Sequence, residues 1–291
     1  MKIALHAKAV NEEVIPYIRQ VYEELAARGA ELFITKTFFK HLQAQGQEWP
    51  EVRLFSRNDS LEGFDFIFSL GGDGTLLDTV TYVGDSEVPI VGINTGRLGF
   101  LATMPKDRIK ELLDAMYHGY FSYEYRALLH LDADQDLFEG KNFALNEFTI
   151  LKKDTSSMIV VHTYIDGEFL NSYWADGLIV ATPTGSTGYS LSCGGPLVLP
   201  QSNNFIVTPV SPHNHYVRPM VVSDKSVISF EIEGRSNHFL VSLDSRSRTV
   251  DAGVQMAVRK EQFRAKLVKQ SGYNFFDTLR QKLNWGLDNR N

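Results

Sequence analysis

The stretch FDFIFSLGGDGTLLDTV, residues 64–80, determines the fold class and points to the chemistry of this chain. An apolar run typical of a buried strand leads into a glycine-rich turn, and an apolar helical pattern follows the turn. Glycines let a backbone approach a phosphate closely, and the free N–H groups at the start of a helix favour an anion. The order of strand, turn and helix therefore predicts a phosphate site formed by Gly71, Gly72, Gly74 and Thr75.

Asp73 lies in the middle of this turn, where its negative charge would repel a phosphate. A carboxylate at this place needs a role that outweighs the repulsion. One role is to take a proton from an attacking hydroxyl group, and another is to hold a magnesium ion. Both roles indicate phosphoryl transfer. The turn is not a Walker P-loop, because no Lys-Ser or Lys-Thr follows its glycines, and the dinucleotide fingerprint G-x-G-x-x-G is also missing.

The composition is that of an ordinary globular protein, with 43% hydrophobic and 22% charged residues in 291 residues, a length that suits two domains. A net charge of −6 argues against nucleic acid as a partner. The one cysteine, Cys193, cannot form an internal disulfide. The first residues lack a signal-peptide pattern, and no apolar run approaches the roughly 18 residues of a membrane span. These observations predict a cytoplasmic protein with no membrane partner.

Two sequence patterns divide the chain. Over residues 1–120, predicted strands alternate with predicted helices, which is typical of an α/β domain with a Rossmann-like, mostly parallel sheet. Over residues 121–271, short runs of alternating polar and apolar residues predict an all-β domain of antiparallel strands. Residues 272–291 return to a helical pattern with Phe275, Phe276, Leu279 and Leu283 on one face. We expect this apolar stripe to be buried by packing back on the N-terminal domain.

Two further motifs in the β domain suggest binding. Residues 176–200, DGLIVATPTGSTGYSLSCGGPLVLP, combine many hydroxyl groups with glycines and could bind sugars and phosphates; alternatively they form a polar turn with Ser186 or Thr187 as a helix N-cap. Asn146-Glu147 interrupts the apolar strand FALNEFTIL, where polar residues are costly to bury without partners. This pair either binds a ligand or belongs to an edge strand with one solvated face.

Taken together, these blocks resemble the signatures of the NAD kinase family. GGDGT, GINTGRLGFLA at residues 92–102, Asn146-Glu147 and the long block at residues 176–200 occur in the order and at the spacing of that family. The last block is the most specific, since lipid kinases and phosphofructokinases share GGDG. The resemblance covers the whole chain. It implies ATP-dependent phosphorylation of the adenosine ribose 2′-hydroxyl of NAD, assisted by Mg²⁺ or another divalent cation, in a homodimer or homotetramer.

The resemblance also implies roles for individual residues. Asp73 matches the catalytic base, and Gly74 its neighbour at the dinucleotide. Asn146 and Glu147 match the pair that binds the adenosine part of NAD, and Asp176 matches a carboxylate near the nicotinamide. The segment that encloses the dinucleotide comprises Thr187, Gly188, Tyr189, Ser190, Leu191 and Ser192. The backbone N–H groups of Gly71 to Gly74 would carry phosphate charge together with the cation.

Three positions depart from the family pattern. Trp174 stands where many relatives have arginine, Gly188 where alanine is frequent, and Arg246 where glutamine is frequent. These departures put the side-chain contacts at Trp174 and Arg246 in question. No protein-bound metal is expected, because His213 and His215 have no further His or Cys cluster beside them.

Two other functions compete with this interpretation. A lipid kinase could share the GGDGT turn, but it would need an apolar slot for acyl chains, whereas residues 176–200 are rich in hydroxyl groups. A non-catalytic dinucleotide sensor would not need a carboxylate in the phosphate turn, so Asp73 argues against it.

Overall fold

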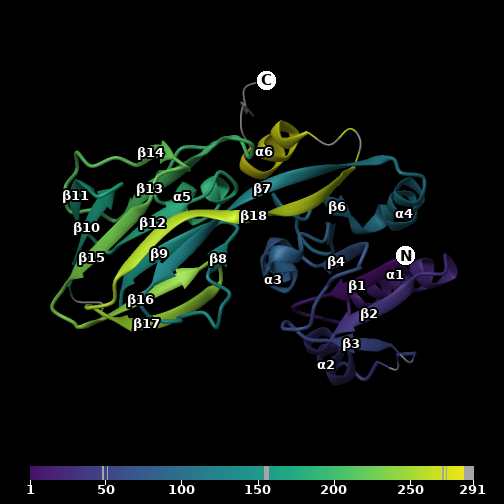
Figure 1. Ribbon diagram of the computed structural model, residues 1–291. Coiled ribbons are helices and arrows are strands. Elements are labelled where there is room, and N and C mark those ends of the chain that lie inside the picture. The colour runs from purple at the N-terminus through teal and green to yellow at the C-terminus, as the bar shows by residue number, and fades with distance from the viewer. Residues whose placement is uncertain (48, 51, 154–156, 271, 273, 285–291) are drawn as a thin grey trace. The chain divides into compact units, whose positions relative to one another are not determined.

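Two long strands, β7 (Phe121–Ala133) and β18 (Met256–Gln270), each contain a boundary between two units of the chain. One unit comprises Met1–Tyr125 and Ala265–Asn291, and the other comprises Arg126–Arg264. The structure is a computed structural model that describes residues 1–47, 49–50, 52–153, 157–270, 272 and 274–284 (Figure 1). Each unit has its own apolar core, so each is described separately.

The first unit is built on a parallel sheet. Its order is β18, β5, β4, β1, β2, β3, with β6 also paired to β5. The strands are β1 (Lys2–His6), β2 (Glu31–Thr35), β3 (Arg53–Phe55), β4 (Phe66–Leu70), β5 (Ile90–Asn94) and β6 (Met104–Pro105). The residues of β4 and β5 are all buried, as expected for central strands of a parallel sheet covered on both faces.

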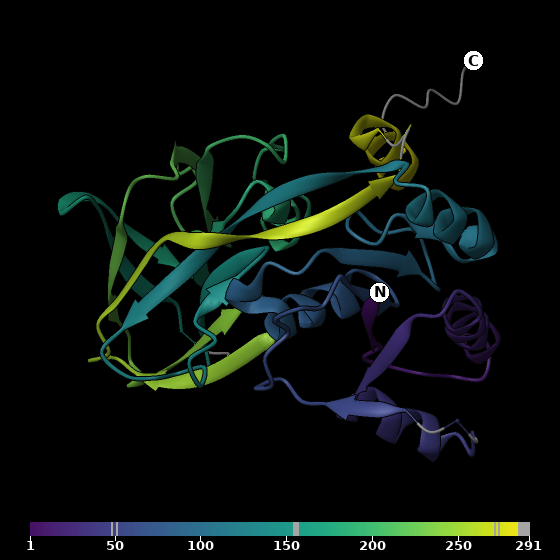
Figure 2. The same ribbon diagram turned by 45° about the vertical axis from the view of Figure 1, so that its right-hand side comes forward.

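Helices connect these strands, which confirms the expected alternation. They are α1 (Ile15–Ala27), α2 (Lys36–Ala44), α3 (Asp73–Val83) and α4 (Ile109–Tyr117), with short 3₁₀ turns η1 (Gly84–Ser86) and η2 (Lys106–Arg108). α1 and α4 lie side by side in both ribbon views, and Arg28 after α1 binds Asp114 of α4 at 2.5 Å (Figures 1 and 2). Ile18, Val21 and Leu25 are buried along α1 at helical spacing.

The C-terminal helix α6 (Phe275–Leu283) belongs to the first unit, as expected, but it buries less than expected. Asn274 caps it by accepting the Phe276 N–H, and Leu279 is 5% exposed. The Phe275 ring lies 6.4 Å from that of Phe100. Phe276 and Leu283 remain 48% and 38% exposed, so the prediction that the whole stripe is buried is wrong for these two residues. Residues 285–291 of the expected C-terminal segment lie outside the described residues.

The second unit is antiparallel throughout its strand pairs. One sheet has the order β14, β13, β12, β9, β16, β17. Its strands are β9 (Glu147–Lys152), β12 (Gly177–Ala181), β13 (Asn204–Val210), β14 (Met220–Ser223), β16 (His238–Leu243) and β17 (Arg246–Asp251). The other strands are β8 (Phe143–Ala144), β10 (Ile159–Ile165), β11 (Glu168–Ala175) and β15 (Ile228–Glu233). η3 (Thr184–Thr187) and α5 (Tyr189–Ser192) follow β12. The expected change from α/β to β structure is thereby confirmed.

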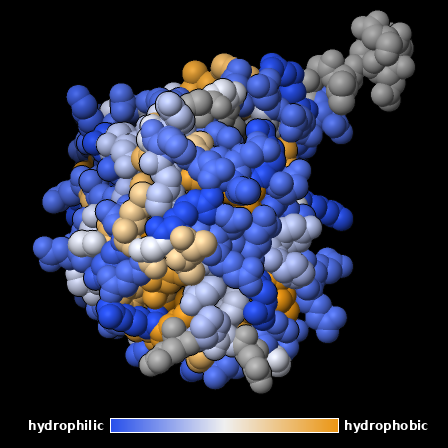
Figure 3. Space-filling view, turned by 90° about the vertical axis from the view of Figure 1, so that its right-hand side faces the viewer, coloured by the Kyte–Doolittle hydropathy of each residue, from blue (hydrophilic) through white to orange (hydrophobic). Residues whose placement is uncertain are grey.

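The surface is mainly hydrophilic, with isolated hydrophobic patches on the face that Figure 3 shows. Within the part of the chain that the structure describes, every helix is too short or too polar to cross a membrane.

Candidate active site

The glycine turn joins the carboxyl end of β4 to the start of α3. The Gly71 N–H donates to the Ile93 carbonyl of β5 at 3.0 Å, so it is used within the protein. The Gly72 carbonyl accepts the Thr75 N–H at 3.0 Å and caps the helix. The amides of Asp73 and Gly74, in the first helical turn, have no acceptor inside the helix. The anion site therefore has fewer N–H donors than expected, because the Gly71 N–H already donates within the protein.

Gly71 itself is required by its surroundings. A Cβ atom at this position would lie 2.2 Å from Thr75 Oγ1 and 2.7 Å from Thr75 Cβ. Thr75 is 8% exposed and cannot move away without disturbing the helix start. The glycine at the end of β4 thus lets the strand turn tightly into α3.

The Asp73 carboxylate is held by the backbone of the loop after β5. It accepts hydrogen bonds from three consecutive N–H groups: Phe100 donates to Oδ2 at 2.8 Å, and Leu101 and Ala102 both donate to Oδ1 at 3.0 Å. A Cβ atom at Gly99 would lie 2.0 Å from Asp73 Oδ1, so only glycine leaves room there. A carboxylate oxygen has two lone-pair positions, and Oδ2 accepts only one of these bonds. Oδ2 can therefore accept a further hydrogen bond from a substrate hydroxyl group.

The loop that holds Asp73 is itself fixed at both ends. The Asn94 side chain closes its first turn, since Nδ2 donates to the Arg97 carbonyl and Oδ1 accepts the Gly96 N–H, both at 2.8 Å. A Cβ atom at Gly92 would lie 3.1 Å from Ala102 Cα, so the loop packs directly on β5. The Arg97 side chain is exposed. The block GINTGRLGFLA thus positions the carboxylate, a role that the sequence alone did not reveal.

In the second unit, Asn146 and Glu147 lie at a break in a strand. FALNEFTIL was expected to be one strand, but β8 ends at Ala144 and β9 begins at Glu147. Asp244, in the turn between β16 and β17, accounts for the break. Its Oδ2 accepts the Leu145 N–H at 2.9 Å, and its Oδ1 accepts the Asn146 and Glu147 N–H groups at 2.7 and 3.2 Å. These amides therefore bind a side chain in place of a neighbouring strand.

Glu147 carries a buried carboxyl group. Burial raises its pKa to about 8, and the nearby negative charge of Asp244 adds to the rise, whereas a hydrogen bond from the Tyr189 backbone works against it. Its Oε2 atom and the Asn146 Oδ1 atom are buried without a hydrogen-bond partner. A Cβ atom at Gly188 would lie 2.9 Å from Glu147 Oε2, so glycine gives this carboxyl group its space. Buried polar atoms need hydrogen-bond partners, so a polar ligand at Asn146 and Glu147 would satisfy both atoms.

The hydroxyl-rich segment after β12 uses many of its hydroxyl groups internally. Thr182 Oγ1 donates to the Leu145 carbonyl at 2.5 Å, and Ser186 Oγ accepts the Val198 N–H at 3.1 Å. Ser190 is fully buried and bonds to Thr208 Oγ1 at 2.8 Å. The Thr187 hydroxyl donates to the Thr184 carbonyl, Tyr189 is 38% exposed, Leu191 is half-buried and Ser192 is exposed. The internal hydrogen bonds fit a polar turn, but the expected N-cap is wrong, because Gly188 and not Ser186 or Thr187 precedes α5.

The segment approaches Asn146 closely. A Cβ atom at Gly185 would lie 2.1 Å from the Asn146 carbonyl oxygen, and the Thr182 N–H donates to that oxygen at 2.8 Å. The structure therefore brings Asn146, Glu147, Gly188 and Tyr189 together within the second unit.

Asp176 and the two residues that depart from the family pattern, Trp174 and Arg246, also belong to the second unit. Lys152 Nζ binds Asp176 Oδ1 at 2.6 Å, and Trp174 is 56% exposed. Arg246 donates to the carbonyl of Lys141 at 2.6 Å and to that of Phe143. Arg246 thus holds the chain just before Asn146, on the same turn as Asp244.

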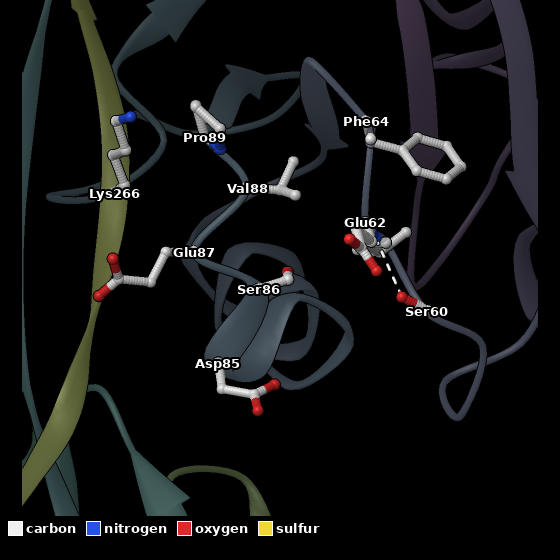
Figure 4. Close-up of a pocket in the computed structure, with 11 residues that line it drawn as sticks. Ser60, Glu62, Phe64, Asp85, Ser86, Glu87, Val88, Pro89 and Lys266 are labelled. Atoms are coloured by element: carbon white, nitrogen blue, oxygen red, sulfur yellow. Dashed lines mark hydrogen bonds between the residues drawn. The ribbon is translucent and has the colours of Figure 1, made fainter.

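The described residues contain no group of three or more His, Cys, Asp or Glu side chains arranged to hold a metal ion. His213 and His215 are exposed, and Cys193 is half-buried, with its pKa raised by burial. A cavity of about 510 Å³ in the first unit is lined by residues 60–64 and 85–89 and by Lys266 (Figure 4). Residues 60–64 precede β4 and residues 85–89 precede β5, so this cavity lies at the opposite ends of these strands from the Asp73 turn.

Comparisons with known proteins agree with these features. The family model "ATP-NAD kinase N-terminal domain" matches residues 3–121, and "ATP-NAD kinase C-terminal domain" matches residues 145–270. The NAD kinase of Cytophaga hutchinsonii is 51% identical over 292 residues, covering all of both chains. An NAD kinase from Archaeoglobus fulgidus, solved in complex with ATP, has a TM-score of 0.75 at 29% identity and covers 98% of this chain and 99% of that one.

A structure of yeast NADH kinase complexed with NADH has the same fold, with a TM-score of 0.88 at 21% identity over 99% of this chain and 88% of that one. Both matched domains, in their order, correspond to the change from α/β to β structure described above. The resemblance carried by the sequence motifs is confirmed, and the chain belongs to the NAD kinase family.

Proposed function

We propose that this chain transfers the γ-phosphoryl group of ATP to the 2′-hydroxyl of the adenosine ribose of NAD and so forms NADP. The observation that carries the proposal is the Asp73 carboxylate, fixed at a helix start beside two amides without helical partners. Support also comes from relatives named NAD kinase and from solved structures that hold ATP or NADH.

In this reaction Asp73 acts as the general base. Its Oδ2 atom takes the proton of the 2′-hydroxyl as that oxygen attacks the γ-phosphorus. The three backbone N–H groups hold the carboxylate in one orientation, so that little reorganisation is needed when the proton moves. The amides of Asp73 and Gly74, at the positive end of α3, stabilise phosphate charge.

Recognition of NAD falls to the second unit. Asn146 and Glu147 bind the adenosine part, because their buried side-chain oxygens Oδ1 and Oε2 need hydrogen-bond partners. With its pKa raised to about 8, the Glu147 carboxyl group is protonated at neutral pH, so it can both donate and accept a hydrogen bond. Gly188 and the exposed Tyr189 border this carboxyl group. Together with Asp176, Thr187, Leu191 and Ser192, they form the proposed dinucleotide site.

A divalent cation held by the protein does not fit the described residues. They contain no group of three or more His, Cys, Asp or Glu side chains arranged to hold a metal ion. We therefore assign Mg²⁺ to the substrate, as the MgATP complex.

The proposed location and assembly follow from the cysteine content and from exposed apolar side chains. The single cysteine agrees with a cytoplasmic location. Tyr123, Tyr125, Phe276 and Leu283 are between 38% and 48% exposed in the single chain, which favours a homo-oligomer that covers some of them. Light scattering of the purified chain would measure its mass, and a monomer at all concentrations would contradict this assembly.

The assay for the activity uses the purified chain with ATP, Mg²⁺ and NAD, and measures NADP with an NADP-specific dehydrogenase. We expect NADP to form, turnover to stop when EDTA removes Mg²⁺, and diacylglycerol and sphingosine to remain unphosphorylated. Phosphorylation of either lipid without NADP would contradict the proposal. Binding of NAD without any turnover would favour the sensor.

A further inference from the structure

A second polar network lies on α3, away from its first turn, and centres on His6 at the end of β1. The His6 side chain is fully buried. Its Nδ1 atom lies 2.9 Å from Thr35 Oγ1, and its Nε2 atom lies 2.9 Å from Asp78 Oδ2. The ring N–H does not point straight at this oxygen, so the second contact is an off-axis one. The imidazole therefore joins the ends of β1 and β2 to the side of α3.

The directions of the hydrogen bonds follow from Asp78 and Thr35. An ionised carboxylate only accepts hydrogen bonds, so the ring proton of His6 is on Nε2, which faces Asp78. Nδ1 is then an acceptor. Thr35 caps α2, where its Oγ1 accepts the Phe38 N–H at 3.2 Å, and its hydroxyl proton remains available for Nδ1.

Charge supports the same assignment. Burial lowers the pKa of His6, and although Asp78 raises it again, the net shift is downward, so the ring is neutral at neutral pH. Burial acts to raise the pKa of Asp78, but its polar contact with His6 and the positive charges of Arg57 and Lys8 outweigh burial and lower the pKa. The network thus pairs a neutral imidazole with an ionised carboxylate.

Arg57 completes the network from the loop after β3. Its NH2 group lies 2.7 Å from Asp78 Oδ1, so both oxygens of Asp78 have partners. The guanidinium also lies 4.9 Å from the centre of the Tyr82 ring, and the His6 ring lies 4.7 Å from that centre. Tyr82 is one helical turn beyond Asp78 on α3, so two successive turns of the helix are held on one side.

This arrangement matters because Asp73 begins the same helix. In the proposed reaction, Asp73 Oδ2 accepts a further hydrogen bond from the substrate hydroxyl group and then its proton, so its bond to the Phe100 N–H weakens as the reaction proceeds. A second anchor on α3 therefore helps to hold the helix start. Asp78 is five residues further along, about 7.5 Å along the helix axis. Contacts at that distance fix the rotation of α3 about its axis and its position along that axis while Asp73 takes part in the reaction.

We propose that the contacts of His6 and Arg57 with Asp78 form a positioning network that keeps α3, and with it Asp73 and the free amides, in the reactive orientation. The inference rests on the proposed function of Asp73. His6 and Asp78 touch no reacting atom in this scheme. They act only through the helix.

The test compares two substitutions of His6. His6→Leu fills similar space but removes both polar contacts, whereas His6→Gln keeps an N–H donor near the place of Nε2. We expect His6→Leu to lower kcat about 10- to 100-fold, since a misplacement on the order of 1 Å can cost that much. The NAD dissociation constant should stay within about 2-fold, because the proposed NAD contacts lie elsewhere in the chain. His6→Gln should recover most of the lost kcat.

Asp78→Asn provides a second variant that keeps the side-chain size and removes the charge opposite Arg57. We expect kcat to fall while the NAD dissociation constant holds. Asp85→Asn, on the exposed η1 turn directly after α3, is the matched control and should retain the kcat of the unmodified chain. Thermal melting of each variant establishes that it is folded under the assay conditions.

Any one of three results would overturn the inference. The first is an unchanged kcat in both His6→Leu and Asp78→Asn. The second is a loss confined to NAD affinity, and the third is a His6→Gln variant as slow as His6→Leu. Failure of the proposed function looks different, because the unmodified chain would then form no NADP at all.

Discussion

Asp73 in the first unit and Asp244 in the second bind the backbone in the same way. Each accepts three consecutive N–H groups, the first on Oδ2 and the next two on Oδ1. Their surroundings differ. Asp73 starts a helix, whereas Asp244 lies in a strand turn with a positive φ of 53° and faces a buried carboxyl group, Glu147.

The electrostatic situation of Asp244 shows what this difference means. Burial raises its pKa, against the three N–H groups and the positive charge of Arg246, which lower it. A carboxylate enclosed in this way fastens two segments of the chain together. The same hydrogen-bond pattern can therefore either hold a reacting group or build a binding loop, and access to substrate decides between the two.

Asp73→Asn should abolish most of the activity. The variant keeps the size of the side chain but cannot accept a proton, and its NH₂ group can satisfy none of the loop N–H donors. We expect kcat to fall roughly 10²- to 10⁴-fold, or about 3 to 5 kcal/mol. Steady-state kinetics with NAD and MgATP provide the measurement.

The matched control for this change is Asp107→Asn, on the exposed η2 turn of the same unit. Its kcat should equal that of the unmodified chain. Near-normal kcat in Asp73→Asn, with only a raised KM for NAD, would make Asp73 a binding residue and leave proton transfer to another group.

Asp244→Asn should affect stability and NAD affinity more than chemistry. Loss of the charge weakens the bonds that hold Leu145, Asn146 and Glu147, and hydrogen bonds to charged groups contribute about 1.5 to 3 kcal/mol. We expect unfolding stability to fall by roughly 2 to 3 kcal/mol and NAD binding to weaken, both measured on the same preparation by urea unfolding and NAD titration.

Asp251→Asn, at the exposed end of β17, is the comparison for Asp244→Asn and should leave both quantities unchanged. If Asp244→Asn bound NAD normally and lost only kcat, the contrast between the two carboxylates would be wrong.

Leu279→Ala and Leu283→Ala test how α6 contributes to the first unit. Leu279 is 5% exposed and Leu283 is 38% exposed. We expect Leu279→Ala to cost about 2 kcal/mol of unfolding free energy, and Leu283→Ala less than about 0.5 kcal/mol in the dissociated chain. Equal losses in urea unfolding at low protein concentration would show that the helix packs through its whole stripe.

Glu147→Gln should change how stability depends on pH. The pKa of Glu147 is raised from 4.5 to about 8, so the folded chain binds a proton that the unfolded chain releases over that interval. The stability gained from this proton is complete below the unfolded pKa and is lost as pH rises through the folded pKa. The unmodified chain should therefore lose more stability than Glu147→Gln between about pH 5 and about pH 9, by several kcal/mol, because each pH unit between the two pKa values contributes about 1.4 kcal/mol.

The pKa of Asp244 is also raised in the folded chain, and Asp244 remains in the Glu147→Gln variant. Part of the pH dependence of stability should therefore persist in that variant. Parallel urea midpoints at the two pH values for both proteins would show that Glu147 is ionised in the folded chain.

Local patterns in the sequence were sufficient to predict the fold. The spacing of apolar residues and the glycine-rich turn identified the strand, turn and helix around Asp73. The spacing of apolar residues also located the change to antiparallel strands near Gly119. The spacing of apolar residues along a segment indicates which of its residues are buried, and this information is contained in the segment itself. The partial exposure of α6 was missed because the same apolar stripe fits either the chain's own surface or a surface outside it.

The missed features of the candidate site all depend on residues far apart in the chain. The break at Asn146 comes from Asp244, 98 residues later, and the Gly71 N–H is used by Ile93 of the next strand. His6 and Asp78 come together from β1 and α3. No local pattern marks such pairs, because each partner is an ordinary polar residue until the tertiary fold places it. The sequence likewise places Ser190 in the segment that encloses the dinucleotide, whereas its hydroxyl group bonds to Thr208, 18 residues away.

The most direct test of the central claim compares Asp73→Asn with Asn146→Ala in one experiment. Single-turnover formation of NADP from saturating NAD and MgATP reports the chemical step, and equilibrium titration with NAD reports recognition. We predict that Asp73→Asn slows the chemical step roughly 10²- to 10⁴-fold with a nearly unchanged NAD dissociation constant. Asn146→Ala should weaken NAD binding more than it slows the bound substrate. If both variants lost the same proportion of rate and affinity, chemistry and recognition would not be divided between these two residues, and the account would be contradicted.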